Sequence, residues 1–416
     1  MMKSNNLLAM AWRNLWRNRR RTLLTLASIV FGVFLAVMFT AMQDQNWADT
    51  INLAARLGGG HVTLQHPEYL DTPTLTRTVR DTDELVRKAL AQPHVERAVP
   101  RIVGQIMLST SNESQGASFV AIEADLEDER TLSVLEGLSE GRMFQTGQDR
   151  GIILGEWLAN TLDTPMGGRV VYTFTDIDGE IVSGLARLSG IIRTGSPGID
   201  RGLCLLPMET VQKVLRYHRN EASQVVVFVE DQRRSQEVAE QLQAETSDQV
   251  TAHPWFETQS ELAGLIAMKV GGARFMEVLI AVLVAAGIFN TFFVNVMERL
   301  REFGILLAIG FSPSRLFSLV MLESLWMALL GLTAAAIVTA GPYYYLSIHG
   351  IDWSSLLGGD NLEVAGVAMP TTIRVGIFPE NAIIIAVFAL LATLLSGIYP
   401  AWRAGQVEPV ETIRLV

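Results

Sequence analysis

Cysteine, nucleotide-binding motifs and zinc-binding motifs are nearly or wholly missing from this sequence. Cys204 is the only cysteine in 416 residues, so no disulfide can form within the chain. There is no Gly-x-x-x-x-Gly-Lys-Ser/Thr stretch, so the chain cannot supply a P-loop ATPase of its own. There is no His-Glu-x-x-His stretch either, and His61 and His66 would point to opposite faces of an expected strand. We therefore expect no metal and no cofactor in this chain.

Basic residues are not in excess either, and the net charge at pH 7 is −10. Nucleic-acid binding depends on lysines and arginines that neutralise phosphates, so we expect no nucleic-acid partner. Gly195-Ser196-Pro197-Gly198 lacks the Gly-x-Ser-x-Gly spacing of a nucleophile elbow and predicts a plain turn. With no catalytic constellation in view, the chain is not expected to be an enzyme.

Long apolar runs are abundant, and four of them are long enough to cross a membrane. Hydrophobic residues make up 49% of the chain, and a helical span needs about 20 residues. We predict transmembrane helices at 22–43, 269–297, 316–346 and 381–400. The third run is too long for one upright span, which predicts a helix that is tilted or protrudes from the bilayer. Buried core helices rarely stay free of charge for as long as residues 22–42 do.

The distribution of arginine predicts how the chain crosses the membrane. Residues 1–21 carry one lysine and five arginines but no acidic residue, which places the N-terminus in the cytoplasm. A cleaved signal peptide would begin similarly, but this apolar run is too long and no small-x-small site follows it. We therefore expect a multi-pass protein of the cell inner membrane with both termini in the cytoplasm. The remaining segments are an extracytoplasmic domain at 44–268, a cytoplasmic loop at 298–315, a short outer loop at 347–380 and a cytoplasmic tail at 401–416.

The loop ERLREFGILLAIGFSPSRLF (298–317) has the pattern of an amphipathic helix. Two pairs of opposite charge stand three residues apart, which supports a helix; they are Glu298 with Arg301 and Arg299 with Glu302. Ser312, followed by a proline, predicts the N-cap of the next helix. A solvated turn would leave the apolar face of the loop exposed, so we predict that a partner protein covers it. That face comprises Leu300, Phe303, Leu307 and Phe311.

The stretch ERLREFGILLAIGFSPSRLFSLVMLESLWMALLG resembles the signature of the FtsX/MacB-like ABC transporter permeases. AWRNLWRNRRRTLLTLASIVFGV resembles that family's N-terminal elbow helix and first span, and YPAWRAGQVEPVETIR resembles its C-terminal ending. The likeness covers both ends, all four spans and the loop between the second and third. GHVTLQHPEYLDTPTL, just after the first span, is similar to the subgroup of the lipoprotein-release permeases LolC and LolE.

The resemblance implies a permease subunit that works with a separate cytoplasmic ABC ATPase, present in two copies, which binds ATP and Mg. In that family a cytoplasmic helix after the second span fits a groove on the ATPase and passes its movement outward, a mechanism called mechanotransmission. The implied cargo is a lipoprotein or another amphiphile, extracted or released at the outer face of the inner membrane. Further implied partners are a second permease copy or a paralogue, membrane lipid, and a periplasmic adaptor or carrier protein.

Three sets of residues are expected to carry this function. The ATPase-coupling set is Glu298, Arg299, Arg301, Glu302, Phe303, Leu307, Phe311 and Ser312. The elbow at 1–21 predicts an interfacial amphipathic helix, whose membrane-interface residues are Trp12, Arg13, Trp16, Arg17, Arg19, Arg20 and Arg21. A helical pattern from about 256 to 310 crosses Gly271 and Gly272, which predicts a hinge there. Close packing between two copies is the alternative interpretation of these glycines.

Glu277 and Glu323 are acidic residues within predicted spans, where a charge is costly and often functional. Glu323, about two turns into the third span, is expected to link the coupling helix to the spans and to face an arginine such as Arg315. For Glu277, near the outer interface, a snorkelling surface carboxylate is the better expectation. A stripe of small residues in the fourth span predicts close helix packing; it comprises Ala389, Thr393 and Gly397.

The segment 44–268 is acidic, with 19 basic against 33 acidic residues and hence a net charge of −14. Strands are expected at 60–66, 98–109, 117–124, 169–175, 180–193 and 223–230. Helices are expected at 81–91, 154–162, 207–217, 232–244 and 256–268. The predicted fold class is therefore an α-helical membrane protein with four transmembrane helices and a large extracytoplasmic mixed α/β domain. The resemblance implies that this domain has a porter-like lobe and an inserted distal lobe at about 110–215.

Other functions stay open at this point. An FtsX-like regulator of periplasmic cell-wall hydrolases would also need an outer domain, but one typically much shorter than these 225 residues. A receptor-type signalling protein would need a cytoplasmic output domain, whereas the expected cytoplasmic pieces are all short. A membrane-anchored hydrolase would need a catalytic constellation. The identity of the cargo, and the choice between a homodimer and a heterodimer, are likewise open.

The predicted topology can be tested by thiol labelling in a Cys204→Ser background. Glu113→Cys and Gly359→Cys should react with a membrane-impermeant reagent in intact cells, because the arginine asymmetry places both outside. Ser312→Cys should react only after the cells are permeabilised. Labelling of Ser312→Cys from outside would overturn the four-span arrangement.

Overall fold

The computed structural model describes residues 4–17, 19–144, 149–352, 363–364, 367–368 and 372–406. The chain divides into two compact units. The helical unit consists of Met1–Asn46, Met268–Asp352 and Thr372–Val416, and the α/β domain consists of Trp47–Ala267 with Trp353–Thr371. Residues 353–362, 365–366 and 369–371 of the predicted outer loop at 347–380, and the tail beyond 406, lie outside the described residues.

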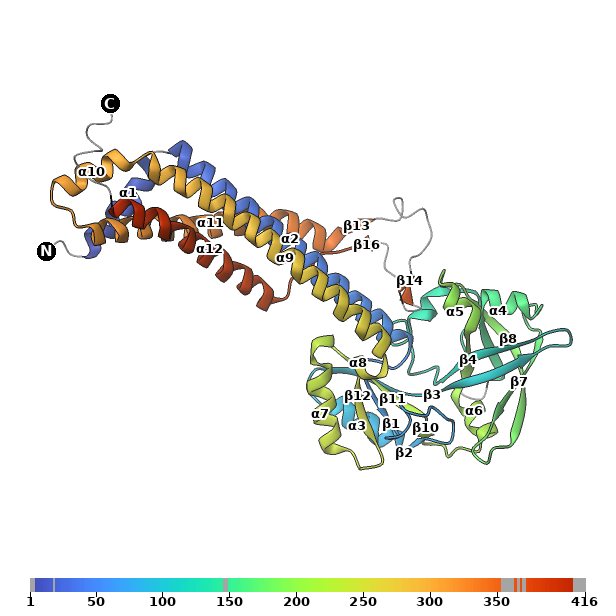
Figure 1. Cartoon of the computed structure of the whole chain (residues 1–416). Helices are drawn as coiled ribbons and strands as arrows, with labels where there is room; N and C mark the ends of the chain where they lie inside the picture. The colour runs from blue at the N-terminus through green and yellow to red at the C-terminus, as the bar shows by residue number, and fades with distance from the viewer. Residues whose placement is uncertain are drawn as a thin grey trace. The chain divides into compact units, whose positions relative to one another are not determined.

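Long apolar helices build the helical unit (Figure 1). Four stretches within them are long and apolar enough to span a membrane, namely Thr22–Leu57, Ser260–Val294, Pro313–His349 and Pro379–Gly405. The four predicted spans are therefore confirmed, and each helix extends beyond its predicted apolar run. The helices are α1 (Ser4–Arg17), α2 (Arg19–Leu57), α9 (Ser260–Met297), α10 (Leu300–Ala308), α11 (Pro313–His349) and α12 (Pro379–Gly405).

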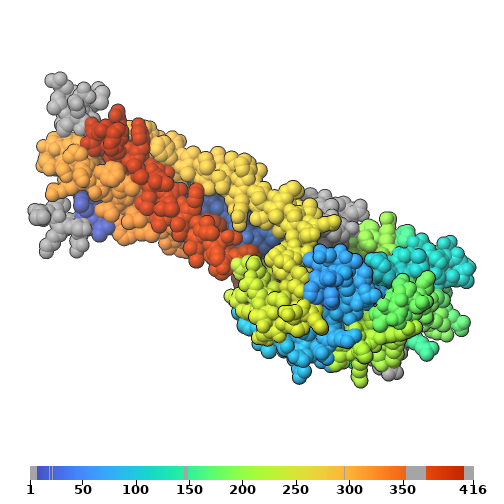
Figure 2. Space-filling model, turned by 60° about the horizontal axis from the view of Figure 1, so that its bottom comes forward, coloured from blue at the N-terminus to red at the C-terminus, as the bar shows by residue number. Residues whose placement is uncertain are grey.

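Small residues bring these helices together. A side chain at Gly397 of α12 would collide with Ser324 of α11, and Thr393 is fully buried. The two helices lie side by side, as Figure 2 shows for the red and orange segments. A side chain at Gly32 of α2 would likewise collide with Val284 of α9. The stripe of small residues predicted for the fourth span is thus confirmed as a packing surface, because only small side chains allow such close approach.

The α/β domain is organised around one sheet, to which ten strands among the described residues contribute. Its order is β12-β1-β11-β3-β4-β9-β6-β8-β5, and β7 pairs with β3 and β8. The strands are β1 (Val62–Gln65), β3 (Val95–Ser109), β4 (Ser114–Ile122), β5 (Leu138–Gly141), β6 (Gly151–Gly155), β7 (Arg169–Thr175), β8 (Ile181–Ile192), β9 (Leu203–Pro207), β11 (Gln224–Val229) and β12 (Thr251–Pro254).

Shorter elements complete the fold. The strand pairs outside the large sheet are β2 (Val79–Arg80) with β10 (Glu221–Ala222), β13 (Ile351–Asp352) with β16 (Thr372–Ile373), and β14 (Glu363–Val364) with β15 (Val367–Ala368). The helices of the domain are α3 (Thr82–Ala91), α4 (Glu156–Thr161), α5 (Pro197–Gly202), α6 (Met208–Leu215), α7 (Ser235–Glu245) and α8 (Trp255–Thr258), with 3₁₀ turns at Ser133–Gly137 and Gln232–Arg234.

The six predicted strands all occur, whereas four strands of the large sheet were missed, namely β5, β6, β9 and β12. For β6 and β9 the reason is clear. Both are short, and all but one of their residues are fully buried, so neither alternates between apolar and polar residues. They pair in parallel with β8 and β4, respectively. A parallel strand that is covered on both faces has a continuous apolar sequence. Periodicity cannot distinguish such a run from part of a buried helix.

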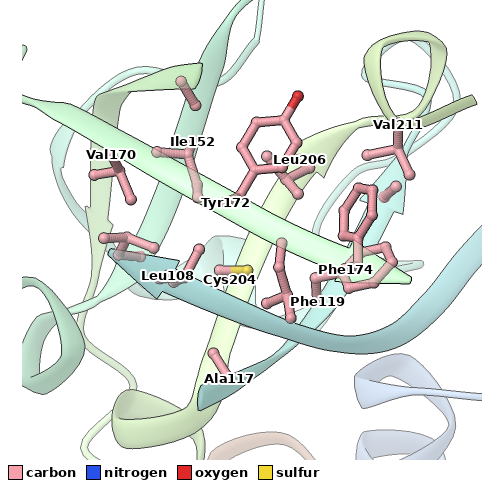
Figure 3. Close-up of a cluster of buried hydrophobic side chains, with 14 of the residues drawn as sticks. Leu108, Ala117, Phe119, Ile152, Val170, Tyr172, Phe174, Cys204, Leu206 and Val211 are labelled. Carbon is pink, nitrogen blue, oxygen red and sulfur yellow. The ribbon is translucent and has the colours of Figure 1, made fainter. Parts of the chain in front are cut away.

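The sheet carries two principal hydrophobic cores. One joins β1, β11, α3 and α7, with residues from Val62 to Ala98 and from Val225 to Val250. The other lies between Ile102 and Ala222 and includes Phe119, Tyr172 and the buried Cys204 (Figure 3). Strand β3 contributes Ala98 to the first core and Ile102 to the second. Both cores belong to one compact unit, and the distal lobe that the family resemblance implied at about 110–215 stays an expectation.

A fully buried ion pair fixes the end of α2 within the α/β domain. The side chains of Arg101 and Glu127 have no exposed surface. Arg101 donates through Nε to Oε1 of Glu127 at 2.6 Å and through Nη2 to Oε2 at 2.9 Å. The guanidinium also donates to the carbonyl oxygens of Gly58, just beyond α2, at 2.7 Å and of Thr131 at 2.8 Å. These bonds satisfy the buried charge, and the loss of one partner would leave the other uncompensated.

His61 is a second buried polar side chain of this domain. Its Nδ1 accepts a hydrogen bond of 3.1 Å from the amide of Val229, and its Nε2 lies 2.9 Å from Oδ1 of Asn52. This arrangement requires the neutral ring, with the proton on Nε2. Burial, assisted by the nearby Arg56, lowers the pKa of His61 to about 4.

Acid should therefore destabilise the α/β domain through His61. The unfolded chain binds a proton near pH 6.5 and the folded one only near pH 4, so stability is lost as the pH falls through this window. The loss at pH 4 should be about 3 kcal/mol. Hydrogen exchange of the Val229 amide against pH measures it. His61→Gln should flatten this dependence, whereas replacing the exposed His218 by Gln should not; equal slopes in all three proteins would refute the assignment.

Candidate functional site

Glu323 lies in α11, and only 5% of its side chain is exposed. Its carboxylate accepts hydrogen bonds from two other segments. Asn14 of α1 donates through Nδ2 to Oε1 at 2.8 Å. Arg299, at the start of α10, donates through Nη1 to Oε2 at 2.7 Å and through Nη2 to Oε1 at 3.3 Å. One carboxylate thereby joins α1, α10 and α11.

The partner of Glu323 differs from the one that the sequence suggested. Arg315 was expected, but it is exposed in the first turn of α11, and its backbone amide is bonded to Ser312. Arg299 is 24 positions before Glu323 and reaches it because α10 folds back against α11. The expected link between the loop and the spans is therefore present, with a different arginine.

Arg299 is held on several sides. Its Nε lies 3.2 Å from Oε2 of Glu302, and its guanidinium lies 5.0 Å from the centre of the Phe303 ring. Burial lowers the pKa of Arg299, but Glu323 and Glu302 outweigh it and raise that pKa above its usual value. Glu302 also forms an ion pair with Arg17 of α1. Because Arg17 and Asn14 belong to the same helix, the three ion pairs and the hydrogen bond from Asn14 form a closed ring between α1, α10 and α11.

The apolar face of α10 is covered by the chain itself, so the prediction that a partner protein covers it was wrong. Phe303 is completely buried among residues of the chain's own α9 and α11, including Phe292 and Leu316. Leu300, Leu307 and Phe311 are partly buried against the same cluster. The sequence pattern correctly placed these residues on one face of a helix, but the fold turns that face inward.

A different set of residues points outward from α10. Ile305 is 48% exposed and Ile309, at the end of the helix, is 73% exposed. Arg301 and Ala308 are exposed beside them. Arg301, Ile305 and Ile309 are four residues apart, so they line up on one side of the helix. We call Arg301, Ile305, Ala308 and Ile309 the outward ridge.

The ends of α10 are set by the residues around it. Glu298 lies in the turn between α9 and α10. After α10, Gly310 has a φ of +95°, a conformation that glycine adopts without strain. Ser312 then accepts a bond from the amide of Arg315 and caps α11, so the predicted N-cap is confirmed.

The elbow is the helix α1, as predicted, but it has an additional role. Ala11 and Leu15 are buried, whereas Trp12 and Trp16 are 37% and 40% exposed. Trp12 also packs edge-on against Trp326 of α11, with ring centres 5.1 Å apart. The predicted interface residues Arg13, Arg17, Arg19 and Arg20 are exposed, and the side chain of Arg21 lies outside the described residues. Asn14 was not among the predicted site residues, and no local signal in the sequence marks it as a partner of Glu323.

Glu277 of α9 faces a cavity inside the helical unit. It accepts a hydrogen bond of 3.0 Å from Thr40 of α2, which is buried. The cavity has a volume of about 410 Å³ and lies between α2, α9 and α12. Apart from Thr40, Glu277 and Asn381, its described lining residues are apolar. Glu277 is half-buried, so it is more enclosed than a snorkelling surface carboxylate would be.

The predicted hinge glycines lie within an unbroken helix. Gly271 and Gly272 belong to α9, and a side chain at either would meet no described heavy atom within 4 Å. The predicted helix from about 256 to 310 is interrupted at Gln259 and at the turn before α10. Neither the hinge nor the packing interpretation is tested by these features, and the hinge stays a prediction.

Comparisons with known proteins agree with this architecture. Residues 22–245 match the model of the MacB-like periplasmic core domain, and residues 274–409 match that of the FtsX-like permease C-terminal domain. A lipoprotein-releasing system transmembrane protein LolC of Xylella fastidiosa is 26% identical, over 81% of this chain and 82% of its own length. A macrolide export ATP-binding/permease protein MacB of Nitrobacter winogradskyi is 21% identical, over 95% of this chain and 58% of its own length.

Among solved structures, the extracellular domain of the ABC-type transporter YknZ from Gram-positive bacteria is similar, with 15% identity and a TM-score of 0.33. It matches 46% of this chain and 98% of its own length. The family model of the periplasmic core alone covers more than half of the chain. Together with the four helices that are long and apolar enough to span a membrane, the two family-model matches show that the chain belongs to the FtsX/MacB-like family of ABC transporter permeases.

Proposed function

We propose that this permease couples ATP hydrolysis by a separate ATPase subunit to the extraction or release of an amphiphile at the outer face of the inner membrane. The outward ridge of α10 is the surface on which the ATPase acts. The termini and α10 then lie in the cytoplasm, and the α/β domain lies on the other side of the membrane. Two ATPase subunits and a second permease copy or paralogue complete the transporter.

The arrangement of α10 is the observation that supports this proposal. Its inward face is part of the core of the helical unit, while Ile305 and Ile309 stay exposed next to a cation, Arg301. Exposed apolar side chains beside a charge are typical of a surface that another protein covers. Because the inward face of α10 is packed in the core of the helical unit, a partner that moves the outward ridge also moves the helices packed against α10.

The Glu323 cluster supplies the transmission in this proposal. Removing one member of a buried ion pair costs about 3–5 kcal/mol, so the pair resists separation when α10 moves. Arg299 and Glu302 connect α10 to α11 and α1, and the three helices should therefore move together. Movement reaches the α/β domain through α2 and α9, which contain residues of both units.

Two observations support an amphiphilic cargo. The LolC relative is named for lipoprotein release. In addition, the cavity beside Glu277 is almost wholly apolar and opens among helices that span the membrane, where an acyl chain would be compatible with the lining. Its volume of about 410 Å³ falls within the usual range of ligand pockets.

Charge introduced on the outward ridge should uncouple the ATPase without unfolding the permease. Ile309→Glu and Arg301→Glu should each lower co-purification of the ATPase and its stimulated hydrolysis at least tenfold, because a buried contact would acquire an unpaired charge. Arg403→Glu, at an exposed arginine of α12, is the matched control. Co-purification and hydrolysis at the parent level in both ridge variants would eliminate this surface as the ATPase contact.

The Glu323 cluster should behave as a buried ion pair. Glu323→Leu alone should destabilise the purified permease by about 3–5 kcal/mol, because Arg299 loses its buried partner and keeps only the more exposed Glu302. The double variant Glu323→Leu with Arg299→Met should recover much of that loss in stability, as a thermal-unfolding cycle would measure. It should not recover stimulated ATP hydrolysis, since α10 is no longer tied to α11. A double variant with parent-level hydrolysis would show that the pair has no part in transmission.

A further inference from the structure

The α/β domain contains a cavity of about 630 Å³ that the coupling proposal does not use. Its floor is the sheet face formed by β1, β11, β3 and β4, and its walls come from the end of α2, the segment 69–73 and α5. Its apolar lining includes Leu57, Leu70, Ile199 and Leu203, and its polar lining includes Gln65 and Gln224.

No lining residue among those described is charged, although the segment around the cavity has 19 basic and 33 acidic residues. Arg101, a buried charge beside the cavity, donates to the carbonyl oxygen of Gly58 and is paired with Glu127. A charged ligand would therefore lose its hydration without gaining an opposite charge. The lining suits a molecule that is uncharged and partly apolar.

Among the described residues that line the cavity, Gln65 has a buried side-chain atom without a bonding partner. Its side chain is 2% exposed, and its Nε2 has no hydrogen-bond partner within the described parts of the chain. Along β1, Val62 and Leu64 belong to the hydrophobic core, whereas Thr63 and Gln65 line the cavity. An unsatisfied buried amide costs about 1–3 kcal/mol, and such a group in a native fold calls for an explanation.

Three neighbouring polar side chains are already bonded. Tyr69 donates to the carbonyl of Val103 at 3.2 Å, and Gln259 donates to that of Ala54 at 3.3 Å. The hydroxyl of Thr63 donates to the carbonyl of Gly59. Gln65 is thus distinguished from them by a donor that is left free for a ligand.

A peptide added to a sheet edge does not fit this site. The strands β1, β11, β3 and β4 each have a neighbour on both sides in the sheet, so their backbone groups face other strands. Recognition must therefore come from side chains over the face of the sheet. The cavity volume falls in the usual range for small-molecule sites.

We propose that this cavity binds an uncharged amphiphile whose carbonyl or ester oxygen accepts a hydrogen bond from Nε2 of Gln65. The apolar part of the ligand packs against Leu57, Leu70, Ile199 and Leu203. The site lies wholly within the α/β domain and does not depend on the ATPase contact proposed above. Variants of the ridge should leave it intact, so the two proposals fail separately.

Photolabelling of the full chain in lipid nanodiscs tests the site. Three probes share one diazirine-bearing chain and differ in charge: a monoacylglycerol, the corresponding fatty acid and the corresponding alkylammonium. The monoacylglycerol should label peptides from 54–73 and 198–203 saturably and should be displaced by its unlabelled form. Labelling of these peptides is divided by labelling of the membrane helices, which corrects for partition of each probe into the bilayer. This ratio should be about tenfold lower for the two charged probes than for the monoacylglycerol.

Substitutions at the cavity provide the second part of the test. Gln65→Met removes the donor at similar volume and should reduce labelling about tenfold, the effect of one hydrogen bond to a buried group. It should also raise the thermal midpoint without ligand, because the unbonded amide is gone, and this shows that the variant folds. Gly202→Phe should abolish labelling by filling the cavity, since a side chain there meets no described atom within 4 Å.

Gln65→Glu should exclude the neutral probe as well, whereas Gln236→Glu makes the same change at an exposed site of α7 and should label like the parent. Equal labelling by all three probes would overturn the proposal. So would parent-level labelling in both Gln65→Met and Gly202→Phe, or a loss in Gln236→Glu that matches the loss at Gln65.

Discussion

In the helical unit, one buried carboxylate holds α1, α10 and α11 together. Glu323 cannot keep its charge inside an apolar helix bundle unless other groups surround it with hydrogen-bond donors. Asn14 and Arg299 supply them from two other segments. This requirement fixes where α1 and α10 lie on α11, and it explains why a loop rich in charge folds onto the bundle instead of remaining in solvent. The ion pair between Arg17 and Glu302 also joins α1 directly to α10.

The same constraint divides α10 into two faces with different tasks. Once Arg299 is bound to Glu323, Phe303 must enter the core with Leu316 and Phe292. The residues left outside are the outward ridge, which is smaller and more polar than the apolar face first expected to meet a partner. An anchored inner face and a free outer ridge together give a helix that can receive movement and pass it on. A loop that was solvated on all sides could not do so.

The α/β domain uses the equivalent device at the other end of α2. Arg101 is fully buried, and it donates four hydrogen bonds, two to Glu127 and one each to the carbonyl oxygens of Gly58 and Thr131. A planar guanidinium suits this task, because it bonds several acceptors in one plane. The end of the first span is therefore fixed within the domain by a charged group whose partners are all internal. By contrast, the cavity over β1 is lined by uncharged groups and keeps one unbonded donor, at Gln65.

Local patterns in the sequence determined the four spans, the amphipathic elbow, the cap at Ser312, six of the strands and the family. Each of these follows from residues close together in the chain, through apolar length, periodicity or turn chemistry. Only the tertiary structure decided that Arg299 pairs with Glu323, that Asn14 joins them, and that the apolar face of α10 turns inward. It also decided that β6 and β9 are strands and that Gln65 faces a cavity. These features depend on residues brought together from distant positions, such as 14, 299 and 323, and periodicity shows that a face is apolar without showing what covers it.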